Sequence, residues 1–407
     1  MSTGYDPLTD DGSGMLYSWF TRARAEEPVF YSSVLGYWVA TRHEDVHEVL
    51  TTPDVYSATV ATTPVRPICD EALAILVGGG WRHRSVFSTD APDHTRFRAL
   101  IQRVFTPKRV AGFEPFIRQQ VEAACDRMEG VDPVDVIAEL CYPVPGLAIL
   151  ELLGFPHSYL AEMKVGATAR IQLATGRLSV DEQVATAHLL VESWRFAGDL
   201  VASRVDDRRG DLMSDLLAVR DGNDAVLTLD QLTSMLLTFF SAGHETSTYM
   251  LANALLHLLA DRPAWAAVGA DPALAADAVE ETLRFDTPIY AWRRLTLTDT
   301  TLGGVAIPAG EIVLAALGSA NRDPDLFPDP DRFDVHRVGA RQHFAFSKGI
   351  HYCIGAPLAR LEGRIALEGL SRRFPDLALA DGKPRPYLPS AVMHGPQELW
   401  VTTGAGR

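Results

Sequence analysis

One cysteine lies in a segment whose residue types suit a metal-binding thiolate. Gly349 and Gly355 flank Cys353, and glycine allows backbone angles that would strain other residues and lets amide groups approach a sulfur closely. Pro357 suits the first turn of a helix, so Cys353 should lie just ahead of a helix N-terminus. There the helix dipole and free N–H groups favour the thiolate, the form of cysteine that binds iron. A lone cysteine is usually buried and inert, but this arrangement favours a metal ligand.

A second group of reactive residues lies on the longest candidate helix, residues 229–261, which contains no proline. At 1.5 Å per residue this helix would be about 50 Å long. It carries the sequence AGHETS at residues 242–247. A glycine within a helix costs about 1 kcal/mol relative to alanine and needs a reason. Ser241, Thr246 and Ser247 can bond backbone carbonyls and open the helix locally. The pattern indicates either a groove with an acid and an alcohol, or a simple kink.

A third pattern, His43-Glu44-x-x-His47, matches the HExxH signature of zinc peptidases. Two histidines four residues apart on a helix could share a zinc ion, with Glu44 as general base. The helix is short, however, and no evident third ligand lies nearby. We therefore favour two solvated histidines, and stoichiometric zinc without iron would reverse that choice.

The elements that must position these residues are mostly helices. Helix-period apolar spacing predicts helices over residues 44–50, 105–128, 181–205, 212–219, 229–261, 263–285 and 357–370. Short strands are predicted at residues 37–41 and within 294–313, where glycines and a proline separate brief apolar runs. The sequence therefore predicts a mainly α protein with small β-sheets.

Composition limits the class of protein. The chain has 407 residues, with 37 Lys and Arg against 52 Asp and Glu, for a net charge of −15. This charge argues against a general nucleic-acid binder, because the phosphate backbone needs a basic face. Residues 1–14 lack the apolar core of a secretory signal, and no stretch reaches the ~18 apolar residues of a membrane-spanning helix. The four cysteines are too few for a disulfide framework. We expect a cytoplasmic protein with no membrane partner.

The spacing Phe346-x-x-Gly349-x-x-x-Cys353-x-Gly355 resembles the haem-ligand loop of the cytochrome P-450 family. Further motifs of that family lie elsewhere in the chain, in the order that the family has them. The resemblance therefore runs from the region of residue 40 to that of residue 399. It implies the cytochrome P-450 fold in a single domain, residues 1–407. Haem b would lie between the long helix and the helix after the cysteine.

The resemblance also assigns roles to single residues. Cys353 would be the iron ligand. Ala242 and Gly243 would form the oxygen groove, with Thr246 bonding the bound oxygen and Glu245 relaying protons. Further haem contacts would come from Phe346, Gly349 and Gly355 and, toward the propionates, from His94, Arg98, Arg294 and His351.

A structural motif accompanies them. Glu281-x-x-Arg284 resembles the Glu-x-x-Arg pair of the family, because residues three apart share a helix face. Arg332 would supply the third partner of this pair. The substrate pocket would be lined by Trp81, Phe87, Phe239, Ile289, Tyr290, Ala291, Trp292, Val392 and Met393. Their apolar character suggests an apolar small molecule with few polar anchors.

The implied reaction is insertion of one oxygen atom from O2, giving hydroxylation or epoxidation, in the tailoring of a secondary metabolite such as a polyketide, macrolide or terpenoid. The sequence has no dinucleotide-binding motif, so electrons would come from a ferredoxin and its NAD(P)H-dependent reductase. We expect the enzyme to act as a monomer. Docking would use two basic stretches: Arg96, Arg98, Arg103, Lys108 and Arg109, and Arg337, Arg341, Lys348, Arg360 and Arg364. Solvated helix faces are the alternative.

Two other functions stay open. One is a haem-thiolate enzyme of altered outcome, such as a peroxide user or a phenol coupler, although these often lack the acid–alcohol pair present here. The other is a non-enzymatic haem binder or gas sensor, which the lack of a signalling domain disfavours.

Overall fold

The computed structural model describes residues 6–7, 15–81 and 86–404. The absence of a secretory signal was inferred from residues 1–14, most of which lie outside this part. The chain forms two compact units, the first from residues 1–60, 113–145 and 246–407 and the second from residues 61–112 and 146–245. The single-domain organisation expected from the sequence stays a prediction, and each unit is described by itself.

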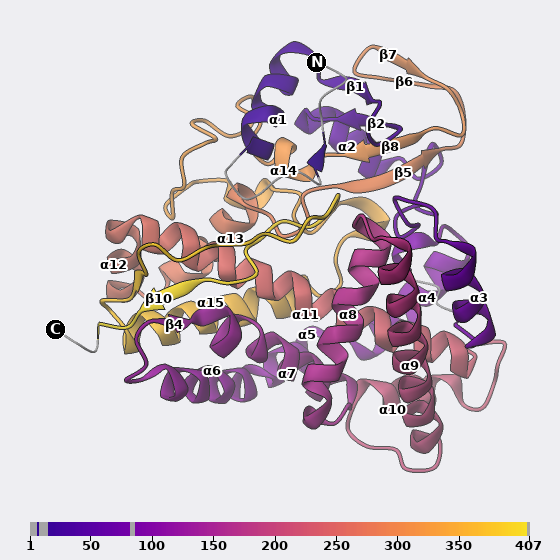
Figure 1. Cartoon of the computed structure of the whole chain (residues 1–407), viewed down its shortest axis with the longest axis horizontal. Helices are drawn as coiled ribbons and strands as arrows, with labels where there is room; N and C mark the ends of the chain where they lie inside the picture. Colours follow the sequence, from indigo (N-terminus) through magenta and orange to yellow (C-terminus); the bar gives the residue numbers. More distant parts are fainter. Residues whose placement is uncertain (1–5, 8–14, 82–85, 405–407) are drawn as a thin grey trace. The chain divides into compact units, whose positions relative to one another are not determined.

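Three small sheets belong to the first unit. The largest has the strand order β1-β2-β8-β5-β3 (Figure 1). Its β2–β8 pair is parallel, with Val39 opposite Leu314, and its β5–β8 pair is antiparallel. The strands are β1 (Val29–Ser32), β2 (Tyr37–Ala40), β3 (Tyr56–Ser57), β4 (Val134–Asp135), β5 (Trp292–Thr296), β6 (Thr300–Leu302), β7 (Val305–Ile307), β8 (Ile312–Ala315), β9 (Ala378–Leu379) and β10 (Trp400–Thr402). The strands predicted at 37–41 and within 294–313 are therefore present.

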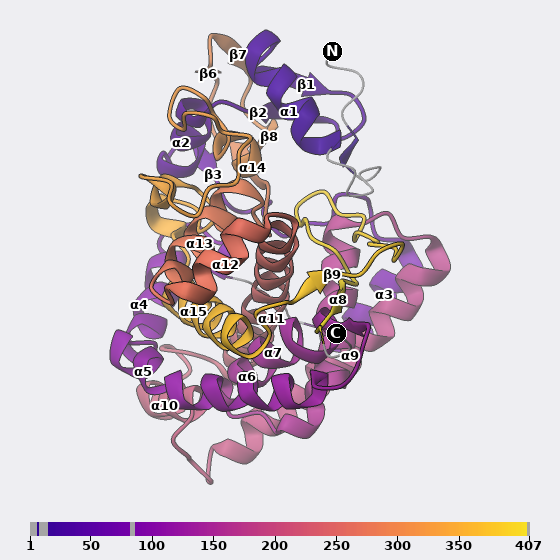
Figure 2. The same cartoon turned by 90° about the vertical axis from the view of Figure 1, so that its left-hand side faces the viewer.

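Helices of the first unit pack around a buried apolar core. Figure 2 shows α12, α13 and α15 side by side, and contacts join each pair of them. The helices of this unit are α1 (Met15–Glu26), α2 (His43–Thr51), α6 (Glu114–Met128), α12 (Arg262–Ala270), α13 (Leu274–Phe285), α14 (Leu317–Ala320) and α15 (Ala356–Arg373).

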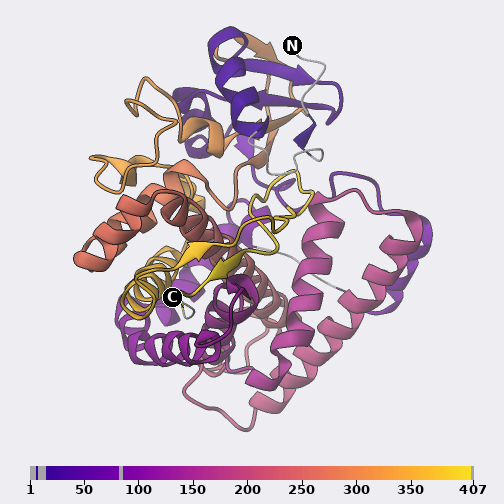
Figure 3. The same cartoon turned by 60° about the vertical axis from the view of Figure 1, so that its left-hand side comes forward.

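The second unit is helical. Its helices α8 and α9 lie side by side, as the magenta pair in Figure 3 shows. A capping box at Ser179 and Glu182 starts α9, which satisfies free N–H groups of its first turn. Its helices are α3 (Asp70–Gly78), α4 (Asp93–Val104), α5 (Pro107–Gly112), α8 (Leu160–Thr175), α9 (Val180–Arg204), α10 (Leu212–Arg220) and most of α7 (Pro143–Leu153), whose residues 143–145 are counted in the first unit. The long helix α11 (Leu229–Ala260) has 32 residues. Its residues 229–245 belong to the second unit and its residues 246–260 to the first.

Two predicted helices are each divided in the structure. Residues 263–285 form α12 and α13, because Pro272 in the sequence Asp271-Pro272 cannot continue a helix ladder. Residues 105–128 form α5 and α6, which are separated at Phe113. The mainly α fold with small sheets is as predicted.

Across residues 15–81 and 86–404, none of the helices is long and apolar enough to cross a bilayer.

Candidate active site

The Cys353 loop connects a short 3-10 turn, Gly349–His351, to helix α15. The Cys353 N–H donates a 2.9 Å hydrogen bond to the Phe346 carbonyl, which closes the loop. Gly349 has a φ of +65°, and a Cβ there would lie 2.9 Å from the Leu50 carbonyl oxygen, so only glycine fits. Gly355 differs from the expectation, because its φ of −78° is open to any residue. It lies against the sulfur, since a Cβ there would be 3.7 Å from Cys353 Sγ.

The Cys353 thiol differs in surroundings from two other cysteines. Burial raises the pKa of Cys125 to about 11 and the pKa of Cys141 still further, so these thiols stay protonated and inert. Cys353 is partly exposed, is not in a disulfide and lies two residues before Gly355, the N-cap of an 18-residue helix. Helix N-termini stabilise anions, and a thiolate is the ligand that haem iron takes from cysteine. The Cys353 thiolate is therefore a suitable ligand for the predicted haem iron.

A network around Glu280 holds this loop in place. Arg360 on α15 donates to Glu280 Oε1 at 2.5 Å and to Glu280 Oε2 at 3.1 Å. His343 Nε2 lies 3.2 Å from the same carboxylate. The Arg360 guanidinium also covers the Phe346 ring at 4.5 Å and bonds the Tyr352 hydroxyl at 3.2 Å. Arg360 therefore ties the residues on both sides of the turn to α13 and α15.

The charge of Glu280 follows from these partners. Burial alone would raise the pKa of its carboxyl group. Hydrogen bonds from His343 and Arg360, and the charge of Arg360, outweigh burial and bring that pKa to about 2. Sequence reasoning missed Glu280, because its neighbour Glu281 carries the recognisable motif.

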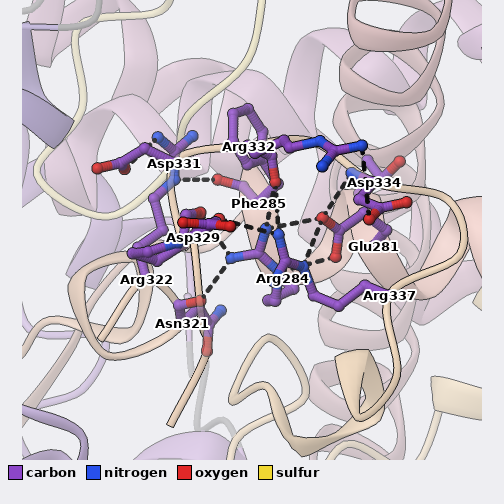
Figure 4. Close-up of polar contacts among 12 residues, drawn as sticks. Glu281, Arg284, Phe285, Asn321, Arg322, Asp329, Asp331, Arg332, Asp334 and Arg337 are labelled. Atoms are coloured by element: carbon purple, nitrogen blue, oxygen red, sulfur yellow. Dashed lines mark hydrogen bonds and ion pairs between the residues drawn. The ribbon is translucent and has the colours of Figure 1, made fainter. Parts of the chain in front are cut away.

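The Glu281–Arg284 pair forms as predicted, but its third partner is not Arg332. Arg284 bonds both Glu281 oxygens at 2.7 Å, and Arg337 Nε lies 3.0 Å from Glu281 Oε1 (Figure 4). Arg332 contributes its backbone carbonyl, which accepts from Arg284 and Arg337. Its own side chain is 71% exposed and lies 4.0 Å from Asp334. The path of the loop instead directs the side chain of Arg337, five residues after Arg332, toward the Glu281 carboxylate.

The signature on α11 lies in a continuous helix, which corrects the expected local opening. Gly243 has a packing reason instead: a Cβ there would lie 3.0 Å from Ile149 Cδ1 on α7. His244 is fully buried and stacks on Phe240, with ring centroids 5.3 Å apart. Gly243 therefore lets α7 approach α11 closely.

Glu245 is a buried acid with an identified partner. Thr168 Oγ1 on α8 donates to Glu245 Oε1 at 2.8 Å. Burial raises the pKa of Glu245, and the Thr168 hydrogen bond opposes that rise in part. An acid with a raised pKa is suited to carry protons near neutral pH. No sequence signal indicated Thr168.

Ser247 has a different partner from the one expected. Its hydroxyl donates to Glu362 Oε2 on α15 at 2.7 Å, not to a backbone carbonyl of its own helix. Glu362 is fully buried. This bond links the helix carrying Thr246 to the helix that begins after Cys353.

The predicted haem contacts lie on several elements. His94 and Arg98 share one face of α4, and burial, followed by the charge of Arg98, lowers the pKa of His94. Arg294 is a buried residue of β5, where its guanidinium donates to the Arg293 carbonyl at 2.9 Å. His351 ends the 3-10 turn before Cys353.

The predicted substrate residues fall into two groups. In the first unit, Ile289 pairs with Met393 and the Tyr290 N–H donates to the Val392 carbonyl at 2.9 Å, which brings these two turns together. Tyr290 is core rather than pocket, because its side chain is 1% exposed and its hydroxyl bonds the Ser390 carbonyl. Ala291 is buried beside it, and Trp292 begins β5.

The second group belongs to the other unit. Trp81 lines a cavity there with residues of α8, α9 and α11. Phe239 is a buried residue of α11, and Phe87 lies in a 3-10 turn, Val86–Ser88.

Several basic residues proposed for docking are engaged within the protein. Arg337 and Arg360 hold Glu281 and Glu280, and Arg364 pairs with Glu114 and Glu368. Arg109 pairs with Asp215. Arg103, Lys108 and Arg341 are exposed.

The HExxH residues lie on α2 against an aromatic ring. His43 stacks on Phe344, with centroids 4.2 Å apart, and the His47 ring lies 6.1 Å from the same ring. Within the described parts of the chain, no three His, Cys, Asp or Glu residues are grouped so as to hold a metal ion.

Comparisons with known proteins show which family the chain belongs to. The family model "Cytochrome P-450" matches residues 273–400. Cytochrome P-450 107B1 of Saccharopolyspora erythraea is 36% identical over 91% of this chain and 90% of its own length. The 6-deoxyerythronolide B hydroxylase of the same organism is 38% identical over 72% of this chain and 71% of its own.

A solved structure covers almost the whole chain. Cytochrome P-450 CREJ in complex with (4-ethylphenyl) dihydrogen phosphate superposes with a TM-score of 0.94 at 34% identity, over 98% of this chain and 99% of that one. Family members carry haem iron and use O2 as monooxygenases. Because it is similar to these relatives over most of its length and carries the cysteine loop, the chain belongs to the cytochrome P-450 family of monooxygenases.

Proposed function

We propose that the protein binds haem b through the Cys353 thiolate and inserts one oxygen atom into an apolar small molecule. The observation that carries this proposal is the partly exposed Cys353 at the N-terminus of α15, in a loop that only glycine at position 349 can form. A haem iron held by a thiolate activates dioxygen, because the thiolate donates electron density to the iron. Phe346, Gly349 and Gly355 shape the loop around the sulfur.

Four side chains are proposed to hold the haem propionates. His94, Arg98, Arg294 and His351 supply donors or positive charge, which suits two carboxylates. Arg294 supplies a buried guanidinium, a group that can bind a carboxylate with two parallel hydrogen bonds.

Glu245 and Thr246 are proposed to deliver protons to the bound oxygen. The support is the buried Glu245, whose carboxyl group is positioned by Thr168 and has a raised pKa. Thr246→Ala should release more of the consumed reducing equivalents as hydrogen peroxide while substrate affinity stays the same. Thr246→Ser keeps the hydroxyl group and should keep the coupling. Equal peroxide release from Thr246→Ala and the wild type would contradict this role.

We propose a secondary metabolite such as a polyketide, macrolide or terpenoid as substrate. One relative is named a 6-deoxyerythronolide B hydroxylase, and one structural neighbour holds an arylphosphate ester. The predicted pocket residues are mainly aromatic and aliphatic, which suits a largely apolar molecule.

We also propose that a ferredoxin, reduced by an NAD(P)H-dependent reductase, supplies electrons to a monomer of this protein. The exposed Arg103 and Lys108 support an electrostatic docking site for an acidic protein. Reversing both charges to Glu should slow reduction and weaken its dependence on salt. Reversing the exposed Arg195 and Arg208 controls for net charge. Unchanged reduction rates in the first variant would contradict the docking role.

A further inference from the structure

The second unit holds a small cavity between α8, α9 and α11. Its interior is small, about 20 Å³, and the empty space grows to about 290 Å³ when the open solvent at its mouth is included. Its walls are mostly apolar, with Met163, Ala167, Leu190, Leu237 and Phe240 among them. Three polar side chains also line it: Arg170 of α8, Ser193 of α9 and Ser241 of α11. An apolar space with a few polar groups is typical of a ligand site.

Arg170 is unlike the buried arginines that have structural roles. Arg284 bonds Glu281 at 2.7 Å, and Arg204 bonds Asp211 at 3.2 Å. Arg170 has one weak hydrogen bond, from Nη1 to the Leu237 carbonyl at 3.3 Å, and none of the ion pairs among the described residues includes it. Among the described residues, its positive charge therefore has no counter-charge.

The guanidinium remains charged despite its surroundings. Burial lowers the pKa of Arg170 to about 10, which still leaves it protonated at neutral pH. Its side chain lines the cavity and is partly exposed to solvent. Burying an unpaired charge is costly, so such a group is expected to meet an anion that the protein itself does not supply.

The rest of the lining supplies no negative charge. Neither Asp nor Glu lines the described wall, Ser241 adds a hydroxyl group, and the Ser193 hydroxyl already donates to the Leu189 carbonyl at 2.9 Å. A ligand group that only accepts hydrogen bonds matches this lining best. Carboxylates and phosphates are such groups, and a guanidinium can bind both with two parallel hydrogen bonds.

We propose that Arg170 binds a carboxylate or phosphate group on an otherwise apolar substrate. The inference rests on the proposed function, because it places the substrate's anionic end in this cavity. Leu237, which anchors Arg170, precedes Glu245 by eight residues on α11, or about 12 Å along the helix. The oxidised carbon should therefore lie remote from the anionic group.

The test measures binding to the haem-loaded enzyme by isothermal titration calorimetry. The probes are decanoate, decyl phosphate and decan-1-ol, which share one chain and differ in the head group. At least one anion should bind about 10- to 100-fold more tightly than the alcohol, as expected for a hydrogen bond to a charged group. The anion that binds more tightly identifies the head group.

Three variants distinguish anion binding by Arg170 from changes that affect the binding of all probes. Arg170→Met should remove the preference for anions and leave decan-1-ol binding unchanged. Arg170→Lys should keep part of the preference. Arg195→Met removes an exposed charge from α9 and should behave as the wild type. Equal binding of all three probes to the wild type, or equal weakening of all three by Arg170→Met, would overturn the proposal.

Thermal unfolding excludes a purely structural role. Without ligand, Arg170→Met should unfold at the same temperature as the wild type or higher, since it removes an uncompensated charge. Arg204→Met should unfold at a lower temperature, because it leaves the buried Asp211 without its positively charged partner. A fall for Arg170→Met as large as that for Arg204→Met would overturn the proposal.

The proposed function is checked on the same preparation by its reduced carbon monoxide spectrum. A thiolate-type band without anion preference removes only the role of Arg170. Absence of that band contradicts the proposed function itself.

Discussion

The Ser247 hydroxyl on α11 donates a 2.7 Å hydrogen bond to Oε2 of Glu362 on α15. The second oxygen of Glu362 is buried with no hydrogen-bond partner in the described part of the chain. Burial raises the pKa of Glu362 to about 8, although the Ser247 hydrogen bond lowers it in part. Glu362 is therefore mostly protonated at neutral pH, in the helix that starts beside Cys353.

This protonated acid predicts a pH-dependent stability. In the folded protein Glu362 keeps its proton up to about pH 8, whereas the unfolded chain releases it near pH 4.5. The folded state thus binds more protons between these values, so stability falls as pH rises, by up to about 1.4 kcal/mol per pH unit. Glu362→Gln should remove this slope, as measured by denaturant unfolding from pH 5 to pH 8.

Ser247→Ala is the matched control for this carboxyl group. It removes the hydrogen bond that lowers the pKa of Glu362, so the loss of stability should continue above pH 8. Identical pH dependence in Glu362→Gln and the wild type would contradict the protonated state.

The second prediction concerns the two arginines that hold Glu281. Arg337→Met should lower the free energy of unfolding by about 3 kcal/mol, because it removes a buried ion-pair partner. Arg332→Met should cost less than about 0.5 kcal/mol, since its side chain is exposed and its carbonyl remains. Urea unfolding of both variants distinguishes them, and a larger loss for Arg332→Met would restore Arg332 as the partner.

The third prediction concerns acid stability. Glu280 has a pKa of about 2 when folded, below its ordinary value near 4.5, so its contribution is full above pH 4.5 and disappears as pH falls toward 2. Glu280→Gln should therefore cost about 3 kcal/mol at pH 7 and progressively less below pH 4.5. The free energy of unfolding of the two proteins, measured from pH 7 to pH 3, checks this. A cost that does not change with pH would contradict the ion-pair explanation.

The fourth prediction compares the two glycines of the cysteine loop. Gly349→Ala should destabilise the loop by about 1 to 3 kcal/mol, because it forces a side chain into a positive φ and against the Leu50 carbonyl oxygen. Gly355→Ala should cost less than about 1 kcal/mol, since its backbone angles are ordinary. The melting temperature of each haem-loaded variant is the measurement. Equal losses of melting temperature in the two variants would show that the positive φ of Gly349 does not determine the conformation of the loop.

Much of the fold could be predicted because local patterns determine it. The helix over 229–261 was predicted almost to its ends, since apolar spacing and the absence of proline are local properties. The division of 263–285 was missed because the apolar spacing continues across Asp271-Pro272. The Cys353 loop was predicted from its glycines, although only Gly349 needs its special backbone angles.

Partners of side chains were harder to predict. Arg332 and Arg337 have the same side chain and lie five residues apart, so only the loop path decides which one reaches Glu281. Thr168 and Glu362 come from other helices, and nothing in their local sequence indicates Glu245 or Ser247 as partners. Such pairs depend on tertiary packing rather than on spacing.

The carbon monoxide difference spectrum of the reduced protein tests the assignment of Cys353 most directly. A thiolate ligand predicts a strongly red-shifted Soret band in the wild type, which Cys353→His should abolish. A histidine-like band in the wild type, or a colourless purified protein, would contradict the assignment of Cys353 as the iron ligand.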